Sequence, residues 1–169
     1  ITDGSDGIAQ NYGHQSSCRW NILLENAKAV KLKVKQFSTE KYFDYLFVGT
    51  SVFPDANDPT NTIFSRHAEL SGEMDDLAQS DTSITMSFVQ SDSALTKQGF
   101  SLHFVSDETV NKNGWEMEWE AVYCLPYEVI SFKQGWFADN SPIASTDPGR
   151  QCKWRVSPIS EKVPVALHL

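Results

Sequence analysis

The most regular pattern in the chain is the stretch Val30-Lys31-Leu32-Lys33-Val34-Lys35-Gln36-Phe37, which alternates apolar and basic residues. A two-residue period places successive side chains on opposite faces of a β-strand. We therefore predict a strand whose apolar side chains, ending near Phe37, face a core while its three lysines face water. Because lysines discourage pairing with another chain, we also expect this row to protect an exposed sheet edge.

Shorter runs of similar character recur along the chain, separated by stretches rich in Pro, Asn, Asp and Gly. The clearest of these runs cover residues 45–48, 83–89, 100–104 and 115–123. Only residues 66–79 look helical, and Gly72 interrupts them. Many short strands joined by turns are typical of a β-sandwich or barrel. The sequence therefore predicts an all-β fold.

Length and charge exclude several classes of function. The chain has 169 residues, which is enough for one domain and part of another. Its 14 Lys and Arg against 22 Asp and Glu give a net charge of −8, which phosphate backbones and anionic lipids repel. No apolar run approaches the roughly 20 residues needed to cross a bilayer. We therefore predict neither nucleic-acid binding nor membrane insertion. The polar residues after Ile1 also do not form a secretory signal.

A long internal repeat indicates two modules. The segment Cys18-Arg19-Trp20-Asn21-Ile22 is echoed by Cys152-Lys153-Trp154-Arg155-Val156, at an interval of 134 residues. That interval suits one sandwich of about 110–130 residues and a short linker. We predict a first domain over residues 1–123 and the incomplete opening part of a second over 124–169. An incomplete sandwich has unpaired edges, so later sequence or another copy must cover them, and copies could polymerise by strand addition.

Five groups of residues, in this order, resemble the CUB domains of extracellular proteins. They are Asn11-Tyr12 with Cys18-Arg19-Trp20, Phe37-Ser38-Thr39-Glu40, Phe43-Asp44-Tyr45-Leu46, Leu70-Ser71-Gly72, and Phe88-Val89-Gln90-Ser91-Asp92 with Gly99-Phe100. The resemblance implies a two-sheet sandwich like a jelly roll, secreted or on the cell surface, and often in tandem arrays. It also implies that the partners are other proteins or copies of the same chain.

The resemblance gives the three cysteines their expected roles. The family's first disulfide maps onto Cys124 and Cys152, and the partner of Cys18 would precede Ile1, which leaves Cys18 unpaired within this segment. Residues 19–123 contain no cysteine, so the second disulfide of many members is missing and the chain is a divergent member. From the residues alone, an odd count means either one pair plus one further thiol or three reduced thiols.

The resemblance also implies a calcium site. Calcium-binding members carry three carboxylates that correspond here to Glu40, Asp44 and Asp92. The Ser-Asp pair before Asp92 is repeated before Asp107, which makes Asp107 the alternate third ligand. We favour Asp92 because its spacing from Gly72 fits better. Close carboxylates repel unless a cation lies among them, and Ca²⁺ takes hard oxygen ligands. The alternative interpretation is three solvated acids on an acidic surface.

No sequence motif points to catalysis. The chain has no nucleophile elbow, phosphate-binding glycine loop or dinucleotide fingerprint. The favoured function is therefore a non-catalytic extracellular structural or adhesion module of a longer tandem-repeat protein, stabilised by calcium. The alternative is a targeting or regulatory module of a secreted enzyme such as a protease. A weaker alternative is a carbohydrate-binding sandwich, although its aromatic residues are more typical of a core: Phe100, Phe104, Trp115 and Trp119.

Overall fold

The computed structural model describes residues 1–2, 11–24, 27–55, 58, 60–88 and 97–123, together with the backbone of 128–130 and 154–156. Its strands are β1 Ser17–Leu23, β2 Ala29–Ser38, β3 Tyr45–Phe53, β4 Ile63–Leu70, β5 Ser83–Ser87, β6 Lys97–Val105, β7 Gly114–Val122, β8 Glu128–Ile130 and β9 Trp154–Val156. Its two short helices are the 3₁₀ turn η1 Met74–Asp76 and α1 Gln79–Thr82.

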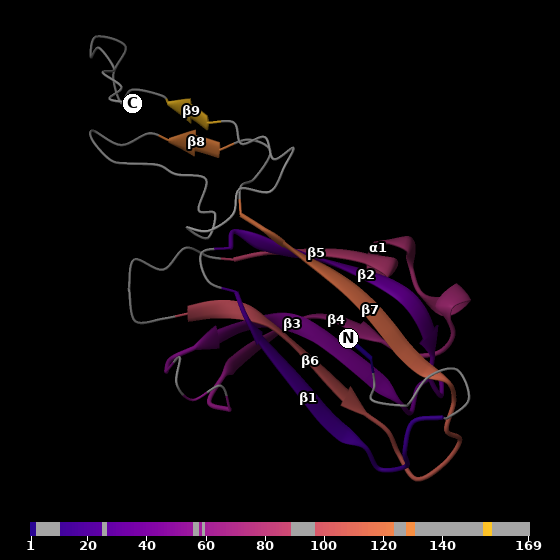
Figure 1. Cartoon of the computed structure of the whole chain (residues 1–169). Helices are drawn as coiled ribbons and strands as arrows, with labels where there is room; N and C mark the ends of the chain where they lie inside the picture. Colours follow the sequence, from indigo (N-terminus) through magenta and orange to yellow (C-terminus); the bar gives the residue numbers. More distant parts are fainter. Residues whose placement is uncertain are drawn as a thin grey trace.

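The first seven strands form two layers (Figure 1). One sheet has the strand order β1-β6-β3-β4 and the other has β5-β2-β7, and every pairing in both sheets is antiparallel. Strands β8 and β9 pair in parallel in a separate two-stranded sheet. The predicted all-β sandwich is therefore confirmed.

Large apolar side chains fill the space between the two layers. Trp20 of β1 and Trp115 of β7 meet edge to face with ring centroids 5.1 Å apart, which links opposite sheets. Burying a large apolar side chain contributes about 1.5–3 kcal/mol, so the inner faces hold the layers together. The fully buried members include Leu32, Leu46, Val48, Phe100, Leu102, Phe104 and Met117.

Strand β2 confirms the alternation predicted from its sequence. Val30, Leu32 and Val34 are buried and the lysines between them are exposed. Phe37 is out of phase with these residues, yet it too is buried. A register shift between Val34 and Gln36 resolves the difference, because a β-bulge inserts one residue and re-aims those that follow.

The expectation that the lysine row protects a sheet edge is wrong. β2 is the central strand of its sheet, between β5 and β7. Its outward lysines lie opposite glutamates of β7, with Lys33 paired to Glu118 in the register and Lys35 Nζ 3.2 Å from a Glu118 oxygen. Cross-strand pairs of opposite charge are favourable on a solvated face. The lysines therefore complement a neighbouring strand.

The helical appearance of residues 66–79 is only partly correct. Residues 63–70 form β4, which pairs with β3, so tertiary pairing overrides the local pattern. Gly72 then adopts φ +100°, a left-handed conformation that glycine tolerates best. The chain becomes helical only in η1 and α1, the short turns that follow.

Candidate metal centre

The first part of the site is the tight turn between β2 and β3. The backbone N–H groups of Phe43 and Asp44 both donate to the carbonyl oxygen of Glu40, at 3.3 and 3.0 Å. Thr39, fully buried before the turn, bonds through its N–H to the carbonyl of Gly72 at 2.8 Å. These bonds fix Glu40 and Asp44 at the two ends of one short turn.

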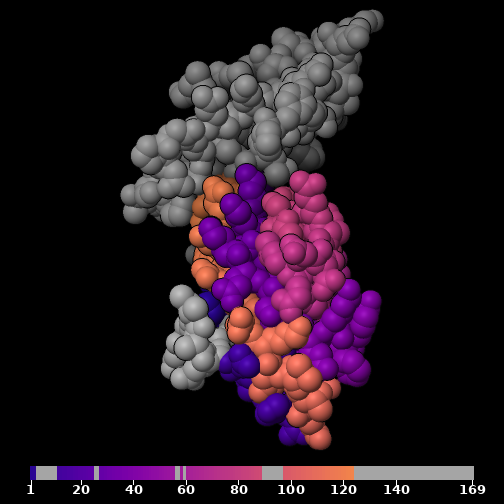
Figure 2. Space-filling view, turned by 90° about the vertical axis from the view of Figure 1, so that its right-hand side faces the viewer, coloured from indigo at the N-terminus to yellow at the C-terminus, as the bar shows by residue number. Residues whose placement is uncertain are grey.

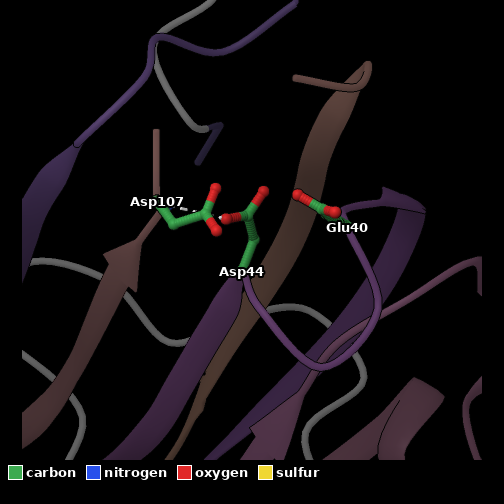
Figure 3. Close-up of side chains that lie close together, drawn as sticks. All are labelled: Glu40, Asp44 and Asp107. Atoms are coloured by element: carbon green, nitrogen blue, oxygen red, sulfur yellow. Dashed lines mark hydrogen bonds between the residues drawn. The ribbon is translucent and has the colours of Figure 1, made fainter. Parts of the chain in front are cut away.

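The second part is the loop that follows β6. Because β3 and β6 are antiparallel and Tyr45 lies opposite Val105, the residue before β3 meets the residues after β6. The backbone N–H of Asp107 donates to Asp44 Oδ1 at 2.9 Å. Figure 3 shows the result, with the Asp44 carboxylate between those of Asp107 and Glu40. One carboxylate oxygen from each residue lies within 4.8 Å of the others.

Asp44 is a fully buried carboxylate, with 0% exposure. The phenol of Tyr12 donates a hydrogen bond to Asp44 Oδ2 and accepts one from the Glu40 N–H at 3.1 Å. Burial and the bond to Asp44 raise the pKa of Tyr12 well above its usual value, so Tyr12 stays protonated and remains a donor. The buried carboxylate is thus oriented from two sides.

The other two carboxylates share a hydroxyl group. Thr109 Oγ1 lies 3.2 Å from Glu40 Oε2 and 3.1 Å from Asp107 Oδ1, and the Thr109 N–H donates to Asp107 Oδ1 at 2.7 Å. Among the described residues, no ion pair joins a lysine, arginine or histidine to Glu40, Asp44 or Asp107. Three like charges therefore converge without a neighbouring cation from this part of the chain.

The donor set fits a hard divalent cation. It offers carboxylate oxygens and a threonine hydroxyl, and Ca²⁺ prefers six to eight such oxygens at about 2.3–2.6 Å. The described group contains neither cysteine nor histidine, the nitrogen and sulfur ligands typical of zinc. Burial of Asp44 also limits screening by water, so a cation between these groups would relieve strong repulsion.

The structure brings together Glu40, Asp44 and Asp107, whereas Asp92 lies outside the described residues. Lys97, the first described residue after Asp92, pairs with Phe53 at the end of β3 opposite Asp44. Cys124 and Cys152 also lie outside the described residues. Cys18 is a free thiol, half-buried on β1.

Sequence reasoning assigned no role to two residues of the site, Tyr12 and Thr109. Tyr12 belongs to the motif Asn11-Tyr12, but its contact with Asp44 spans 32 positions and depends on the fold. Thr109 follows Asp107 by two residues, a spacing at which side chains and backbone of a turn commonly bond. That spacing was the one local signal for Thr109.

The sequence model of the CUB domain matches residues 4–104, more than half of the chain. No curated protein matches the sequence. Fourteen solved chains match, among them the CUB1-EGF-CUB2 domain of human MASP-1/3, with 21% identity and a TM-score of 0.49. That match covers 72% of this chain and 40% of the other.

The protein is therefore an all-β sandwich of two antiparallel sheets, with an acidic cluster at one end of its strands. The chain belongs to the CUB domain family. CUB domains are generally extracellular or cell-surface modules that mediate contacts between proteins and are not themselves catalytic. Neither helix in the described part of the chain is long and apolar enough to span a bilayer.

Proposed function

We propose that this chain is a calcium-stabilised interaction module of a secreted or cell-surface protein. One observation carries the proposal: Glu40, Asp44 and Asp107 converge from two loops without a cation from the described residues. Asp107 takes the place of Asp92 as the third ligand because its backbone is bonded to Asp44. Calcium, with two positive charges, would offset most of the repulsion among the three carboxylates and hold the two loops together.

The surroundings of the acidic cluster support a protein partner. Tyr42, Phe43 and Val110, on the same two loops, are exposed by 72%, 58% and 54%. Large contiguous apolar patches mark protein contact sites, and we propose that these three side chains form part of one. Aromatic residues are enriched in protein interfaces, where they supply contact area at low entropy cost. We propose that a partner places a lysine near the calcium-bound edge and apolar side chains on these three residues.

We further propose that residues 124–169 begin a second CUB-like domain closed by a Cys124–Cys152 disulfide. Trp20 of the first Cys-x-Trp motif lies in β1, and Trp154 of the second lies in β9, which supports the repeat. Later sequence or another copy would then complete the sandwich, and tandem copies could assemble through its edges. In this arrangement the chain is part of a structural or adhesion protein.

The alternative functions have less support. A targeting module of a secreted enzyme would use the same interaction surface, and no described residue favours it over adhesion. The carbohydrate-binding alternative rests on four aromatic residues of the strands, of which Phe100, Phe104 and Trp115 lie in the core. Only Trp119 of that group is exposed, by 43%, and its ring contacts Phe100. We therefore favour protein contacts.

Thermal melting in calcium and in chelator tests the proposal. If calcium binds only the folded chain, a hundredfold excess over Kd adds about 2.7 kcal/mol of stability. For a domain of this size we expect the melting temperature to rise by several degrees. Mg²⁺ at matched ionic strength should give a smaller rise because it loses its waters reluctantly.

Three variants identify the ligands. Asp44→Ala and Asp107→Ala should each abolish the calcium-dependent rise, because each removes one of the converging carboxylates. Asp92→Ala is the matched control and should keep the rise of the unmodified chain. The opposite result for Asp92 and Asp107 would restore Asp92 as the ligand. An unchanged melting temperature in the unmodified chain would show that the three acids do not form a calcium site.

A further inference from the structure

The 3₁₀ turn η1, taken together with its N-cap residue Glu73, carries a pair of carboxylates that the proposed metal site does not use. Its first and last groups fix one another, because the Glu73 N–H donates to Asp76 Oδ2 at 2.8 Å while the Glu73 side chain accepts from the Asp76 backbone. A Cβ at Gly72 would lie 2.6 Å from Asp76 Oδ2, so the Asp76 side chain packs closely against the backbone that leads into the turn. The two carboxylates are therefore held in defined positions.

Each carboxylate of η1 pairs with a lysine from one of the two loops of the acidic cluster. Lys41 Nζ lies 2.6 Å from Asp76 Oδ1, and Lys112 Nζ lies 2.5 Å from Glu73 Oε1. Lys41 directly follows Glu40, and Lys112 follows Asp107 in the loop between β6 and β7. Figure 2 shows the pink surface of the segment around η1 beside the purple surface of β2 and the orange surface of that loop.

Both lysines lie on the loops of the cluster, and the ion pairs that they form are with Asp76 and Glu73. The bond from Lys112 lowers the pKa of Glu73, and the bonds from the Glu73 N–H and Lys41 lower the pKa of Asp76. Both carboxylates are therefore charged at neutral pH. The backbone of the Lys112 loop also contacts the site, since the Lys112 carbonyl accepts from the Tyr12 N–H at 3.2 Å.

A lysine that lost its partner would seek another carboxylate. Its ammonium group is a compact charge on a flexible four-carbon stem, so it re-pairs easily. On their own loops the carboxylates available as acceptors are Glu40 beside Lys41, and Asp107 and Glu108 before Lys112. An ammonium group beside Glu40 or Asp107 would compete directly with a divalent cation.

We propose that Glu73 and Asp76 are positioning residues that keep Lys41 and Lys112 away from the acidic cluster and so preserve its affinity for an external cation. This inference rests on the proposed calcium site. Two roles for η1 can be distinguished. If η1 only held the loops in place, the charges of Lys41 and Lys112 would not affect calcium binding.

Calcium titration calorimetry on the full 169-residue chain tests the inference, with melting temperatures in chelator as a record of folding. We expect Glu73→Gln and Asp76→Asn each to weaken calcium binding by about tenfold, the usual scale for residues that orient a metal site. Removing the released lysine should restore the affinity, so Glu73→Gln/Lys112→Met and Asp76→Asn/Lys41→Met should bind like the unmodified chain. Glu69→Gln is the matched control, because it breaks the Arg66–Glu69 pair on β4 and should leave the affinity unchanged.

The outcomes separate the two proposals. An unmodified chain that binds no calcium overturns the proposed site and this inference together. An unmodified chain that binds, with Glu73→Gln and Asp76→Asn binding equally well, overturns the inference alone. Weakened binding that the lysine substitutions fail to restore also overturns it, since η1 would then act as a simple brace. The two pairs are tested separately, so that one poorly folded variant leaves the other decisive.

Discussion

Tyr12 connects the hydrophobic core to the acidic cluster through a single side chain. Its ring packs edge to face on Phe104 with centroids 5.0 Å apart, while its hydroxyl bonds to Asp44 and to the backbone of Glu40. The ring therefore fixes the hydroxyl, and the hydroxyl fixes the deepest carboxylate. A change at the hydroxyl alone separates these two contributions.

We expect Tyr12→Phe to lower the free energy of unfolding by about 1–3 kcal/mol in chelator, because it leaves a buried carboxylate oxygen without its donor. The packing on Phe104 should survive, since the ring is unchanged. Tyr45→Phe is the matched control, because the Tyr45 hydroxyl donates to the Tyr42 carbonyl at an exposed position where water can replace it. Urea unfolding measures both, and equal losses would contradict the special role of Tyr12.

Individual site residues were predictable only where local spacing defines them. Glu40 and Asp44 lie at the two ends of one short turn, so the sequence places them near each other. The identity of the third carboxylate depends on which strand pairs with β3, because the loop after that strand lies next to Asp44. The repeated Ser-Asp pair offers two candidates, Asp92 and Asp107. The register of β6 against β3 brings Asp107 to Asp44, and no local pattern encodes that register.

At the scale of strands, periodicity predicted the interior of β2 but not its neighbours. The alternation of Val30, Leu32 and Val34 with lysines specifies which face is buried, since that depends on the strand alone. Its central position depends on β5 and β7, which come from distant parts of the chain. The lysine row was therefore assigned to an edge, although its glutamate partners lie on β7.

The backbones of β1 and β6 approach closely at Gly99, and this contact allows the pairing of the two strands to be tested. A Cβ on Gly99 would lie 1.9 Å from the carbonyl oxygen of Ile22, a backbone atom that cannot move without separating the strands. We expect Gly99→Ala to destabilise the domain by about 1–3 kcal/mol or more, as overpacking does elsewhere. Gly13→Ala is the control, since its Cβ would meet only the Ser16 side chain, at 3.3 Å.

Thermal or urea unfolding of the two glycine variants tests the pairing of β1 with β6. A loss at Gly99 that clearly exceeds the loss at Gly13 supports the observed pairing of β1 with β6. Equal stabilities would mean that the two strands are not in this register. Neither glycine belongs to the acidic cluster, so calcium should shift both variants as it shifts the unmodified chain.

For the whole chain, the sequence predicted the sandwich more readily than its limits. Short alternating runs and turns favour a sandwich or a barrel, because each strand has one apolar face to bury. The resemblance to CUB domains favours the two-sheet form. The division at residue 124 rests on the repeated Cys-x-Trp motif, and that inference extends to residues outside the described part. Pairing of the cysteines is the direct chemical test of this division.

We expect one free thiol per denatured, unreduced chain, with Cys18 as the thiol and a Cys124–Cys152 disulfide. Cys18 lies on β1 and is bonded to no other cysteine among the described residues, which do not include Cys124 or Cys152. A disulfide that closes a loop of this size stabilises by about 3 kcal/mol in the chain-entropy model. Peptide mapping without reductant identifies the linked pair, and a peptide joining Cys18 to either other cysteine would refute the division.

The charge ladder on the outer face of β2 and β7 affects how partners find the molecule. Lys31 and Lys33 there lie opposite Glu120 and Glu118, and Lys35 also pairs with Glu118, so that face contributes little to the net charge of −8. Around the acidic cluster, by contrast, Lys41 and Lys112 are outnumbered by nearby acids: Glu40, Asp44, Glu73, Asp75, Asp76, Asp107 and Glu108. The charge is thus unevenly distributed over the described residues, and a cationic partner of the kind proposed would be attracted toward these loops before any contact forms. Salt shortens the reach of that attraction, so the speed of encounter, more than the lifetime of the complex, varies with ionic strength.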